Sequence, residues 1–375
     1  MKSRFLILGA GFGGLELSTL LSEEFGASAD VTLIDVNDHF MFGFSKLDVM
    51  FGHAEAKDVR MPYVRFIKPG VKFLQERITA IAPEARRVTT DRGTYEADHL
   101  VVALGADYDI AATPGLSEMN EFYSVAGAMK LRDILPNFKR GHALVGVCGA
   151  PFKCPPAPSE CVLMLHDYLE QRGVRKDCKI SLVIPLSAPV PPSPETSKAL
   201  LAEFKERGIE FHAAKGVASI DAAKRIATLT DGSQMPFDLF LGVPKHHVPA
   251  VVRDSGLSEG GWIKVNPRTL ESKFANVYAV GDGANTGTPK AGVFAERAAS
   301  AVATALIAKV KGGQASEYDG FGTCYIEFGG GKIGKVEVDF FSGPQPKGNY
   351  YEPSTELRAD KQLFGSSRRA RWFGM

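Results

Sequence analysis

The sequence predicts an α/β protein with two Rossmann-like nucleotide-binding domains and a small C-terminal α+β region. Two patterns of apolar strand, glycine-containing turn and helix predict the two domains, one opening the chain and one starting at residues 142–147. From about residue 315, two alternating stretches around three glycines indicate antiparallel strands instead. We expect residues 1–106 and 255–314 to form the first domain, residues 107–254 the second, and residues 315–375 the C-terminal region.

The composition excludes several classes of protein. The chain has 375 residues, with 44 lysines and arginines against 43 aspartates and glutamates, so its net charge is +1 and gives no general attraction to nucleic acid. Its five cysteines do not suit the disulfide framework of a small secreted protein, and they lack metal-ligand spacing with histidines. No apolar run could span a bilayer, and the first strand begins at about Arg4. We therefore expect a cytoplasmic protein without a metal site, with peripheral attachment to the inner face of the cell membrane as an alternative.

The first strand–turn–helix pattern has the spacing of a dinucleotide-binding loop. A buried strand runs into Gly9, Gly11 and Gly14, and a helix follows from Leu15. The glycines give the tight turn, the close approach to a pyrophosphate and the close packing of helix on strand. The next strand ends in Asp35, which is placed to hydrogen-bond a ribose hydroxyl. These four residues are our candidates for binding a dinucleotide.

Three further positions are expected at the same edge of the first sheet. The buried strand that starts at residue 98 ends in a turn at Gly105, and the strand of residues 275–280 is followed by Gly281 and Asp282. An acid at the carboxyl end of a parallel strand lies where open α/β sheets bind ligands. Lys290 opens the next helix, which runs to about residue 310. Its charge and the helix N-terminus could stabilise a bound anion, and a solvated surface lysine is the alternative.

The second domain departs from the nucleotide-binding pattern where its phosphate loop should be. After the strand of residues 142–147, residues 149–160 read Gly-Ala-Pro-Phe-Lys-Cys-Pro-Pro-Ala-Pro-Ser-Glu. The prolines are expected to delay the next helix to about residues 159–170, so that Cys154 lies just ahead of a helix N-terminus and beside Lys153. Both features favour the thiolate over the thiol, and a buried, inert cysteine is the alternative.

The strand that follows also lacks a nucleotide signal. Residues 179–184 end in Pro185, where a nicotinamide site would have a charged residue to bind the ribose. Residues 185–194 are rich in proline and predict a loop. We therefore expect a nucleotide-binding repeat without a nucleotide, and no use of NADH or NADPH.

Two aromatic segments each have two interpretations. Residues 39–61 could form a lid over a planar cofactor, although core packing is favoured for most of their aromatic side chains. The tail, residues 355–375, is expected to be partly helical and carries Arg368, Arg369, Arg371, Trp372 and Phe373. This mixture suits an anionic membrane surface or an acidic partner, and a helix docked on the protein is the alternative.

Together these motifs resemble the sulfide:quinone oxidoreductases and the flavoprotein subunit of flavocytochrome c sulfide dehydrogenase, flavoproteins with two dinucleotide-binding domains. The specific motifs are residues 151–160, Thr323-Cys324-Tyr325 and Pro289-Lys290; the generic ones are the first glycine loop with Asp35 and residues 280–282. The resemblance implies bound FAD, a sulfide or other small sulfur donor, and a quinone acceptor. It also implies a redox-active Cys154–Cys324 disulfide beside the flavin, with Glu160 as the proton acceptor.

Departures from the family pattern keep other functions open. No cysteine precedes Cys148, where many quinone-reducing members have a third one, and none lies in residues 40–50, where the flavocytochrome branch attaches FAD. We therefore expect non-covalent FAD. The tail is short for the paired membrane helices of the quinone-reducing members. The alternatives are a flavocytochrome-c-type sulfide dehydrogenase, a flavin oxidoreductase for another thiol or persulfide, a type II NADH:quinone oxidoreductase, and an FAD-containing sulfide sensor without turnover. The sequence leaves the oligomeric state open.

Overall fold

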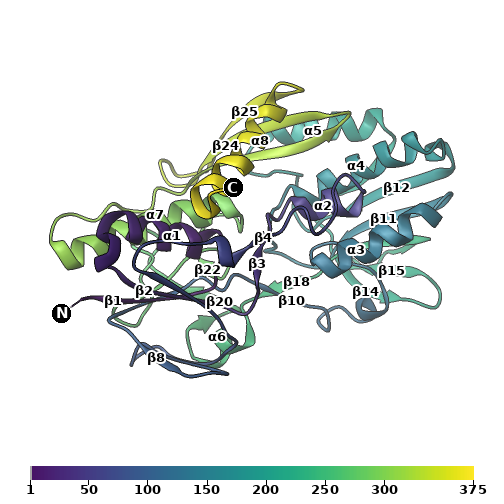
Figure 1. Cartoon of the computed structure of the whole chain (residues 1–375). Helices are drawn as coiled ribbons and strands as arrows, with labels where there is room; N and C mark the ends of the chain where they lie inside the picture. Colours follow the sequence, from purple (N-terminus) through teal and green to yellow (C-terminus); the bar gives the residue numbers. More distant parts are fainter. Residues whose placement is uncertain (1) are drawn as a thin grey trace.

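A five-stranded parallel sheet forms the core of the first lobe, in the order β21-β9-β1-β2-β5 (Figure 1). The computed structural model describes residues 2–375. The strands are β1 (Arg4–Leu8), β2 (Asp30–Asp35), β5 (Val71–Gln75), β9 (His99–Val102) and β21 (Val277–Ala279). Helices α1 (Phe12–Phe25) and α7 (Gly292–Lys311) pack against each other on one face of this sheet. Strand β21 therefore brings the chain after residue 255 back into the lobe that the first 106 residues begin.

Smaller elements complete the first lobe. A three-stranded antiparallel sheet, β6-β7-β8, lies on the face opposite α1, and Arg92 and Gly93 lie in the turn between β7 and β8 (Figure 1). A second small sheet has the order β19-β20-β22. The bounds are β6 (Ile78–Ala82), β7 (Arg87–Thr90), β8 (Thr94–Glu96), α6 (Ala250–Asp254), β19 (Ser258–Glu259), β20 (Trp262–Lys264) and β22 (Ala284–Asn285).

The second lobe has a four-stranded parallel sheet in the order β13-β12-β11-β17. These strands are β11 (Gly141–Val147), β12 (Cys178–Val183), β13 (Ile209–His212) and β17 (Leu239–Val243). One face packs on α3 (Val125–Ile134), α4 (Ala157–Gln171) and α5 (Pro194–Glu206), and the other on β14 (Val217–Asp221), β15 (Ile226–Leu229) and β16 (Gln234–Pro236). Strands β10 (Asp107–Asp109) and β18 (Lys245–His247) pair antiparallel where the chain enters and leaves this lobe. This pairing supports our proposal that the second domain begins near residue 107.

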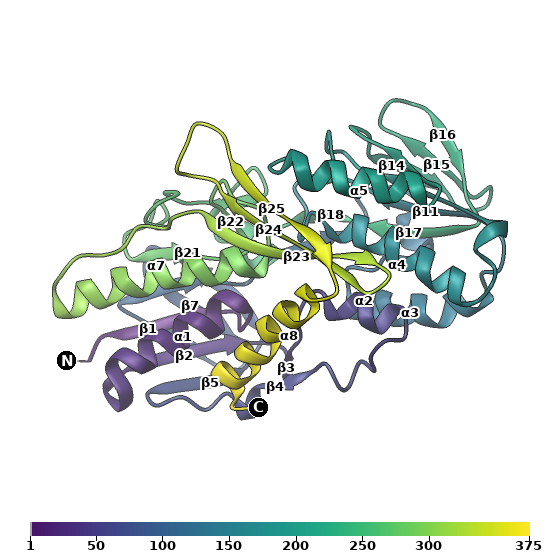
Figure 2. The ribbon, with the colours of Figure 1, turned by 90° about the horizontal axis from the view of Figure 1, so that it is seen from above.

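The C-terminal chain bridges the two lobes (Figure 2). The two predicted strands are present as β23 (Phe321–Gly329) and β24 (Lys332–Asp339), with Cys324 opposite Val336. Strand β25 (Lys347–Ser354), which the sequence analysis missed, completes the sheet. Strand β23 packs on α4 of the second lobe and on α7 of the first, so a residue on β23 can reach both.

Several predicted boundaries shift by a few residues. Helix α1 begins at Phe12 rather than Leu15, and α4 begins at Ala157, two residues before the predicted start. Pro158 fits because the first turn of a helix needs no N–H there. Residues 185–193 form a loop, as predicted, and the Ser193 side chain accepts a hydrogen bond from the Thr196 N–H at the start of α5.

Residues 39–61 form short elements of secondary structure joined by loops. Strand β3 (His39–Phe40) pairs with β4 (Met61–Pro62), and α2 (Ser45–Met50) follows β3. The rings of Phe42 and Phe51 are buried, which confirms core packing for these two residues, whereas Phe40, also buried, and Phe44 line the cavity between the lobes.

The C-terminal tail docks on the first lobe. Helix α8 (Leu357–Arg368) continues into a π-helical turn over residues 369–373. The Trp372 indole is buried and donates to Glu16 Oε2 at 2.7 Å, and Arg371 forms ion pairs with Glu16 and Glu23, each at 2.8 Å. These side chains contact the first lobe, as the docked-helix alternative expects. In residues 2–375 we find no helix whose length and apolar character would let it cross a bilayer.

Candidate active site

A large cavity of about 960 Å³ lies where the two lobes and the C-terminal sheet meet. The first glycine loop lines one part of it, and the loop that carries Cys154 lines another. Cys324 on β23 and Lys361 on α8 also face it. Every predicted site residue except Gly14 lines this cavity: Gly9, Gly11, Asp35, Gly105, Cys154, Glu160, Gly281, Asp282, Lys290 and Cys324.

The three glycines of the first loop have distinct geometric roles. Gly9 has a φ of +97°, and a Cβ there would lie 2.4 Å from the Ala103 carbonyl oxygen. A Cβ on Gly14 would lie 1.9 Å from the Gly9 carbonyl oxygen, so this glycine permits the turn to close on the first turn of α1. Gly11 faces the cavity, and no atom lies within 4 Å of a Cβ placed there. A phosphate group could therefore approach the backbone at Gly11.

Asp35 is held at the cavity wall by the same loop. Its Oδ2 accepts from the Ala10 N–H at 2.7 Å, and its Oδ1 accepts from the Asn37 N–H at 2.8 Å. The Asn37 side-chain amide also donates to Oδ1, at 2.8 Å, so Oδ2 is the oxygen that keeps a lone pair for a ligand hydroxyl, as expected for a group that binds a ribose. The Tyr63 hydroxyl donates to the Ala10 carbonyl at 2.7 Å. Tyr63 has no sequence signal for this role, because it lies 53 residues from the loop it supports.

Lys290 is a buried residue, which excludes the surface alternative. Its Nζ donates to the Asp282 carbonyl oxygen at 2.7 Å and lies 3.5 Å from the centre of the Trp262 ring. Burial lowers the pKa of Lys290 to about 8. Burial raises the pKa of the Asp282 carboxyl, while Lys153, Lys290 and Lys46 oppose that rise. Three lysines around one acid leave an excess of positive charge, which suits a cofactor that becomes negative on reduction.

The Cys154 loop is fixed to both lobes. The Cys154 N–H donates to the Lys290 carbonyl oxygen at 2.7 Å, and the Ala157 N–H donates to the Cys154 carbonyl oxygen at 2.9 Å. Cys154 itself has a φ of +49°, an unusual conformation for a residue with a side chain. Backbone strain of this kind gathers at functional sites and persists where the surroundings hold it, as these two hydrogen bonds do here.

Cys154, Cys324 and Glu160 face the same end of the cavity. Glu160 lies in the first turn of α4 and is buried, with Oε1 accepting from the Glu327 N–H at 2.9 Å. That hydrogen bond ties α4 to β23, the strand that carries Cys324. All five cysteines are unpaired in this structure, so the pKa directions given below refer to free thiols.

The prediction that Cys154 favours the thiolate is wrong for this state. Burial, the Glu160 charge and Cys324 raise the pKa of Cys154 well above its usual range. Burial and Glu160 likewise raise the pKa of Cys324 to about 12. The Lys153 side chain does not lower the pKa of Cys154, because its Nζ donates to the Ala106 carbonyl oxygen at 3.0 Å and lies over the Tyr108 ring. A dry pocket with a carboxylate therefore outweighs the helix N-terminus.

The other three cysteines stand apart from the cavity lining. Cys148, Cys161 and Cys178 are buried in the core, and burial raises the pKa of each; for Cys148 it rises to about 11. This is the environment of cysteines that act as small apolar side chains. In residues 2–375, no three His, Cys, Asp or Glu side chains are grouped in a way that could hold a metal ion.

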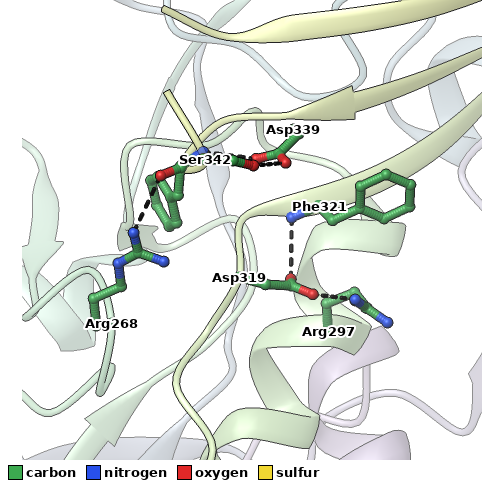
Figure 3. Close-up of a pocket in the computed structure, with 7 residues that line it drawn as sticks. Arg268, Arg297, Asp319, Phe321, Asp339 and Ser342 are labelled. Atoms are coloured by element: carbon green, nitrogen blue, oxygen red, sulfur yellow. Dashed lines mark hydrogen bonds and ion pairs between the residues drawn. The ribbon is translucent and has the colours of Figure 1, made fainter. Parts of the chain in front are cut away.

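A second, shallower pocket of about 560 Å³ lies on the surface beside β23 and β24 (Figure 3). Arg297 forms an ion pair with Asp319, and Asp339 accepts hydrogen bonds from Ser342. Its arginines and aspartates are equal in number, and its lining includes neither a cysteine nor a histidine. The pocket therefore does not contribute to the redox site.

The comparisons with known proteins agree with this geometry. The family model described as "Pyridine nucleotide-disulphide oxidoreductase" matches residues 3–305. The fold and the dinucleotide loop thus define a two-domain flavoprotein, an FAD-dependent oxidoreductase. The chain belongs to the pyridine nucleotide-disulphide oxidoreductase family.

Several relatives are sulfide:quinone oxidoreductases. The mitochondrial sulfide:quinone oxidoreductase of Mus musculus is 25% identical over 362 residues, covering 90% of this chain and 78% of the relative. The crystal structure of the sulfide:quinone oxidoreductase from Aquifex aeolicus matches with a TM-score of 0.86 at 21% identity, covering 98% of this chain and 91% of that one. A type II NADH:quinone oxidoreductase of Staphylococcus epidermidis is 34% identical, but over 122 residues, which are 32% of this chain and 30% of the relative.

Proposed function

We propose that this protein oxidises sulfide to sulfur or polysulfide through Cys154 and Cys324 and passes the electrons through FAD to a quinone. The observation that carries the proposal is the placement of both cysteines and the buried Glu160 in one cavity with the dinucleotide loop. The similarity to sulfide:quinone oxidoreductases over most of the chain supports the choice of donor and acceptor.

The proposed reaction begins with thiol–disulfide exchange. Hydrosulfide attacks one sulfur of the Cys154–Cys324 disulfide, so one cysteine becomes a persulfide and the other leaves as a thiolate. A second hydrosulfide takes the outer sulfur as hydrogen disulfide, which gives a proton to one of the two cysteine thiolates, and Glu160 accepts this proton when the disulfide re-forms. Re-forming the disulfide releases two electrons. FAD, which Gly9, Gly11 and Asp35 would hold in the turn that Gly14 permits, would supply the two-electron acceptor between the cysteine pair and the quinone.

The residues also support an assignment without a nicotinamide cofactor. The loop after β11 is occupied by prolines and Cys154, where a glycine-rich loop would bind a second dinucleotide. A type II NADH:quinone oxidoreductase and an NAD-dependent thiol reductase both need that second site. We propose that reducing equivalents enter at the cysteines.

Steady-state turnover tests the proposal. Purified protein with sulfide and a short-chain quinone should reduce many quinone molecules per flavin, whereas NADH should not replace sulfide. Reduction of a single equivalent followed by a stalled, reduced flavin would favour the sensor. Turnover with cytochrome c but not with quinone would favour the sulfide dehydrogenase alternative.

We also propose that the protein meets a membrane through apolar residues beside the docked tail rather than through the tail itself. Val64 and Ile67 are 80% and 81% exposed, and the segment that carries them contacts the tail, since the Phe66 and Phe373 rings lie 6.2 Å apart. Such exposed side chains can insert into the interfacial region of a bilayer. We expect co-sedimentation with anionic vesicles that falls in the V64S/I67S variant. Equal co-sedimentation of both proteins would contradict this.

A further inference from the structure

Four charged side chains from four elements meet at the cysteine end of the cavity. They are Glu160 on α4, Glu327 on β23, Asp48 on α2 and Lys361 on α8. The Glu327 N–H donates to Glu160 Oε1 at 2.9 Å, and Lys361 Nζ donates to Glu327 Oε1 at 2.5 Å. The Lys361 side chain is only 14% exposed and lies over the Phe44 ring. Helix α8 thus places one buried ammonium group near three carboxyl groups.

The charges in this cluster do not balance. If Glu160, Glu327 and Asp48 were all ionised, three negative charges would face the Lys361 ammonium, with His53 Nδ1, 3.9 Å from Asp48 Oδ1 on the more exposed side, as the other group that can carry a positive charge. Glu160 is the most buried of the four, with 3% exposure, whereas the side chains of Glu327 and Asp48 are 19% and 34% exposed. The remaining titratable groups that act on or face Glu160 are the thiols of Cys154, Cys161 and Cys324 and the phenol of Tyr123. Their pKa values are all raised, so they are neutral in this state.

The pKa of Glu160 is therefore determined by two opposing groups of effects. Burial raises the pKa of Glu160 to about 7, with Glu327 and Asp48 adding to the rise, while Lys361 and the Glu327 N–H lower it. Burial also acts against the Lys361 ammonium, but Glu160, Glu327 and Asp48 outweigh it and raise the pKa of Lys361. Lys361 thus stays charged across the range in which Glu160 titrates.

We infer that Lys361 is a positioning residue whose ammonium, fixed by Glu327, holds Glu160 in the ionised form that accepts a proton. The C-terminal helix α8 thereby sets the pH range in which the cysteine pair reacts with sulfide. This inference rests on the proposed function for the role of Glu160. The geometry of the cluster does not depend on that role.

The sign of the effect follows from the charges. An ionised Glu160 is required, so the rate of flavin reduction by sulfide should rise with pH through the Glu160 pKa. Removing the Lys361 charge in Lys361→Met takes away a stabilising cation, and the pKa of Glu160 must rise further. We expect the rising limb to move up by about one pH unit, which is about a ten-fold loss of rate below neutral pH and recovery at high pH. Lys361→Arg keeps the charge and should keep the profile.

The control is a lysine–glutamate pair of the same kind away from Glu160. Lys335 Nζ lies 2.8 Å from Glu337 Oε1 on β24, and neither residue lines the cavity. Lys335→Met should leave the pH profile unchanged. The ionisation of sulfide affects the pH profile of every variant equally. A difference between the profiles of two variants therefore reports a change in the protein. If Lys361→Met fails to retain FAD, Lys361→Gln serves in its place.

A second readout does not need the reaction. Infrared titration of the protonated carboxyl band that Glu160→Gln removes reports the ionisation of Glu160 with no sulfide present. A midpoint that rises in Lys361→Met but not in Lys361→Arg supports the inference, even if sulfide proves not to be the donor. An unchanged midpoint in Lys361→Met overturns the inference. Failure of wild-type protein to react with sulfide at any pH would instead overturn the proposed function.

Discussion

Serine in place of Cys154 or Cys324 is expected to abolish reduction of the flavin by sulfide while the protein still binds FAD. Each variant removes one sulfur of the pair, so neither a disulfide nor a persulfide with a leaving thiolate can form. We expect the rate to fall to below about one hundredth of that of wild type, because a hydroxyl does not take part in thiol–disulfide exchange. Anaerobic stopped-flow absorbance after addition of sulfide measures this rate.

Cys178→Ala is the matched control for the two serine variants. Cys178 is buried at the start of β12 and does not line the cavity, so its loss should leave sulfide reduction near the wild-type rate. Near-normal reduction in Cys154→Ser or Cys324→Ser would rule out the disulfide mechanism. It would leave the flavin to react with sulfide directly.

The second large effect is expected at the first glycine loop. Gly14→Ala places a Cβ 1.9 Å from the Gly9 carbonyl oxygen, so the turn that carries Gly9 and Gly11 has to open. Overpacking of this kind costs about 1–3 kcal/mol of folding free energy, and the phosphate-binding geometry is lost with it. We expect a purified variant with little or no FAD and a lowered melting temperature. The ratio of flavin to protein absorbance and a thermal melt measure the two effects.

Two other glycines separate these effects. Gly11→Ala adds a Cβ that meets no protein atom but faces the cavity, so FAD binding should weaken while the fold is kept. Gly93→Ala, in the turn between β7 and β8, meets only the Tyr95 side chain at 3.5 Å or beyond and should change neither property. Wild-type flavin content in Gly14→Ala would mean that the cofactor is held elsewhere.

The first glycine loop could be predicted from residues that are neighbours in the sequence. The roles of Gly9, Gly14 and Asp35 follow from a strand, a tight turn and a helix that are neighbours in sequence. The structure reproduces the close contacts at Gly9 and Gly14 and places the Asp35 carboxylate beside the loop. Elements formed by neighbouring residues depend little on the remainder of the fold, so the sequence predicts them well.

The proposed pairing of Cys154 with Cys324 could not be predicted in this way. The two residues are 170 positions apart, and only the resemblance to a known family connected them before the fold was seen. The structure adds the physical connection, because the Glu160–Glu327 hydrogen bond joins α4 to the strand of Cys324. Lys361 was missed for the same reason. It lies in the tail, and nothing nearby in sequence indicates that its charge acts on Glu160.

The thiolate prediction failed because it used only the neighbours in sequence. A helix N-terminus and an adjacent lysine do lower a thiol pKa when they face it. In the folded chain Lys153 turns toward Ala106, and Glu160 arrives from the following helix with a negative charge. Burial and charge from outside the motif therefore decide the state of Cys154. Contacts between segments that are distant in sequence also hold the docked tail, where Glu16 on α1 binds Arg371 and Trp372.

Mass mapping of the cysteines tests the central claim most directly. The oxidised, FAD-loaded protein is digested after alkylation of free thiols, before and after anaerobic exposure to sulfide, while the flavin absorbance is recorded. Our account predicts a Cys154–Cys324 cross-linked peptide in the oxidised protein, and its loss together with bleaching of the flavin after sulfide is added. Alkylation of both cysteines in the oxidised protein, with bleaching by sulfide still complete, would contradict it.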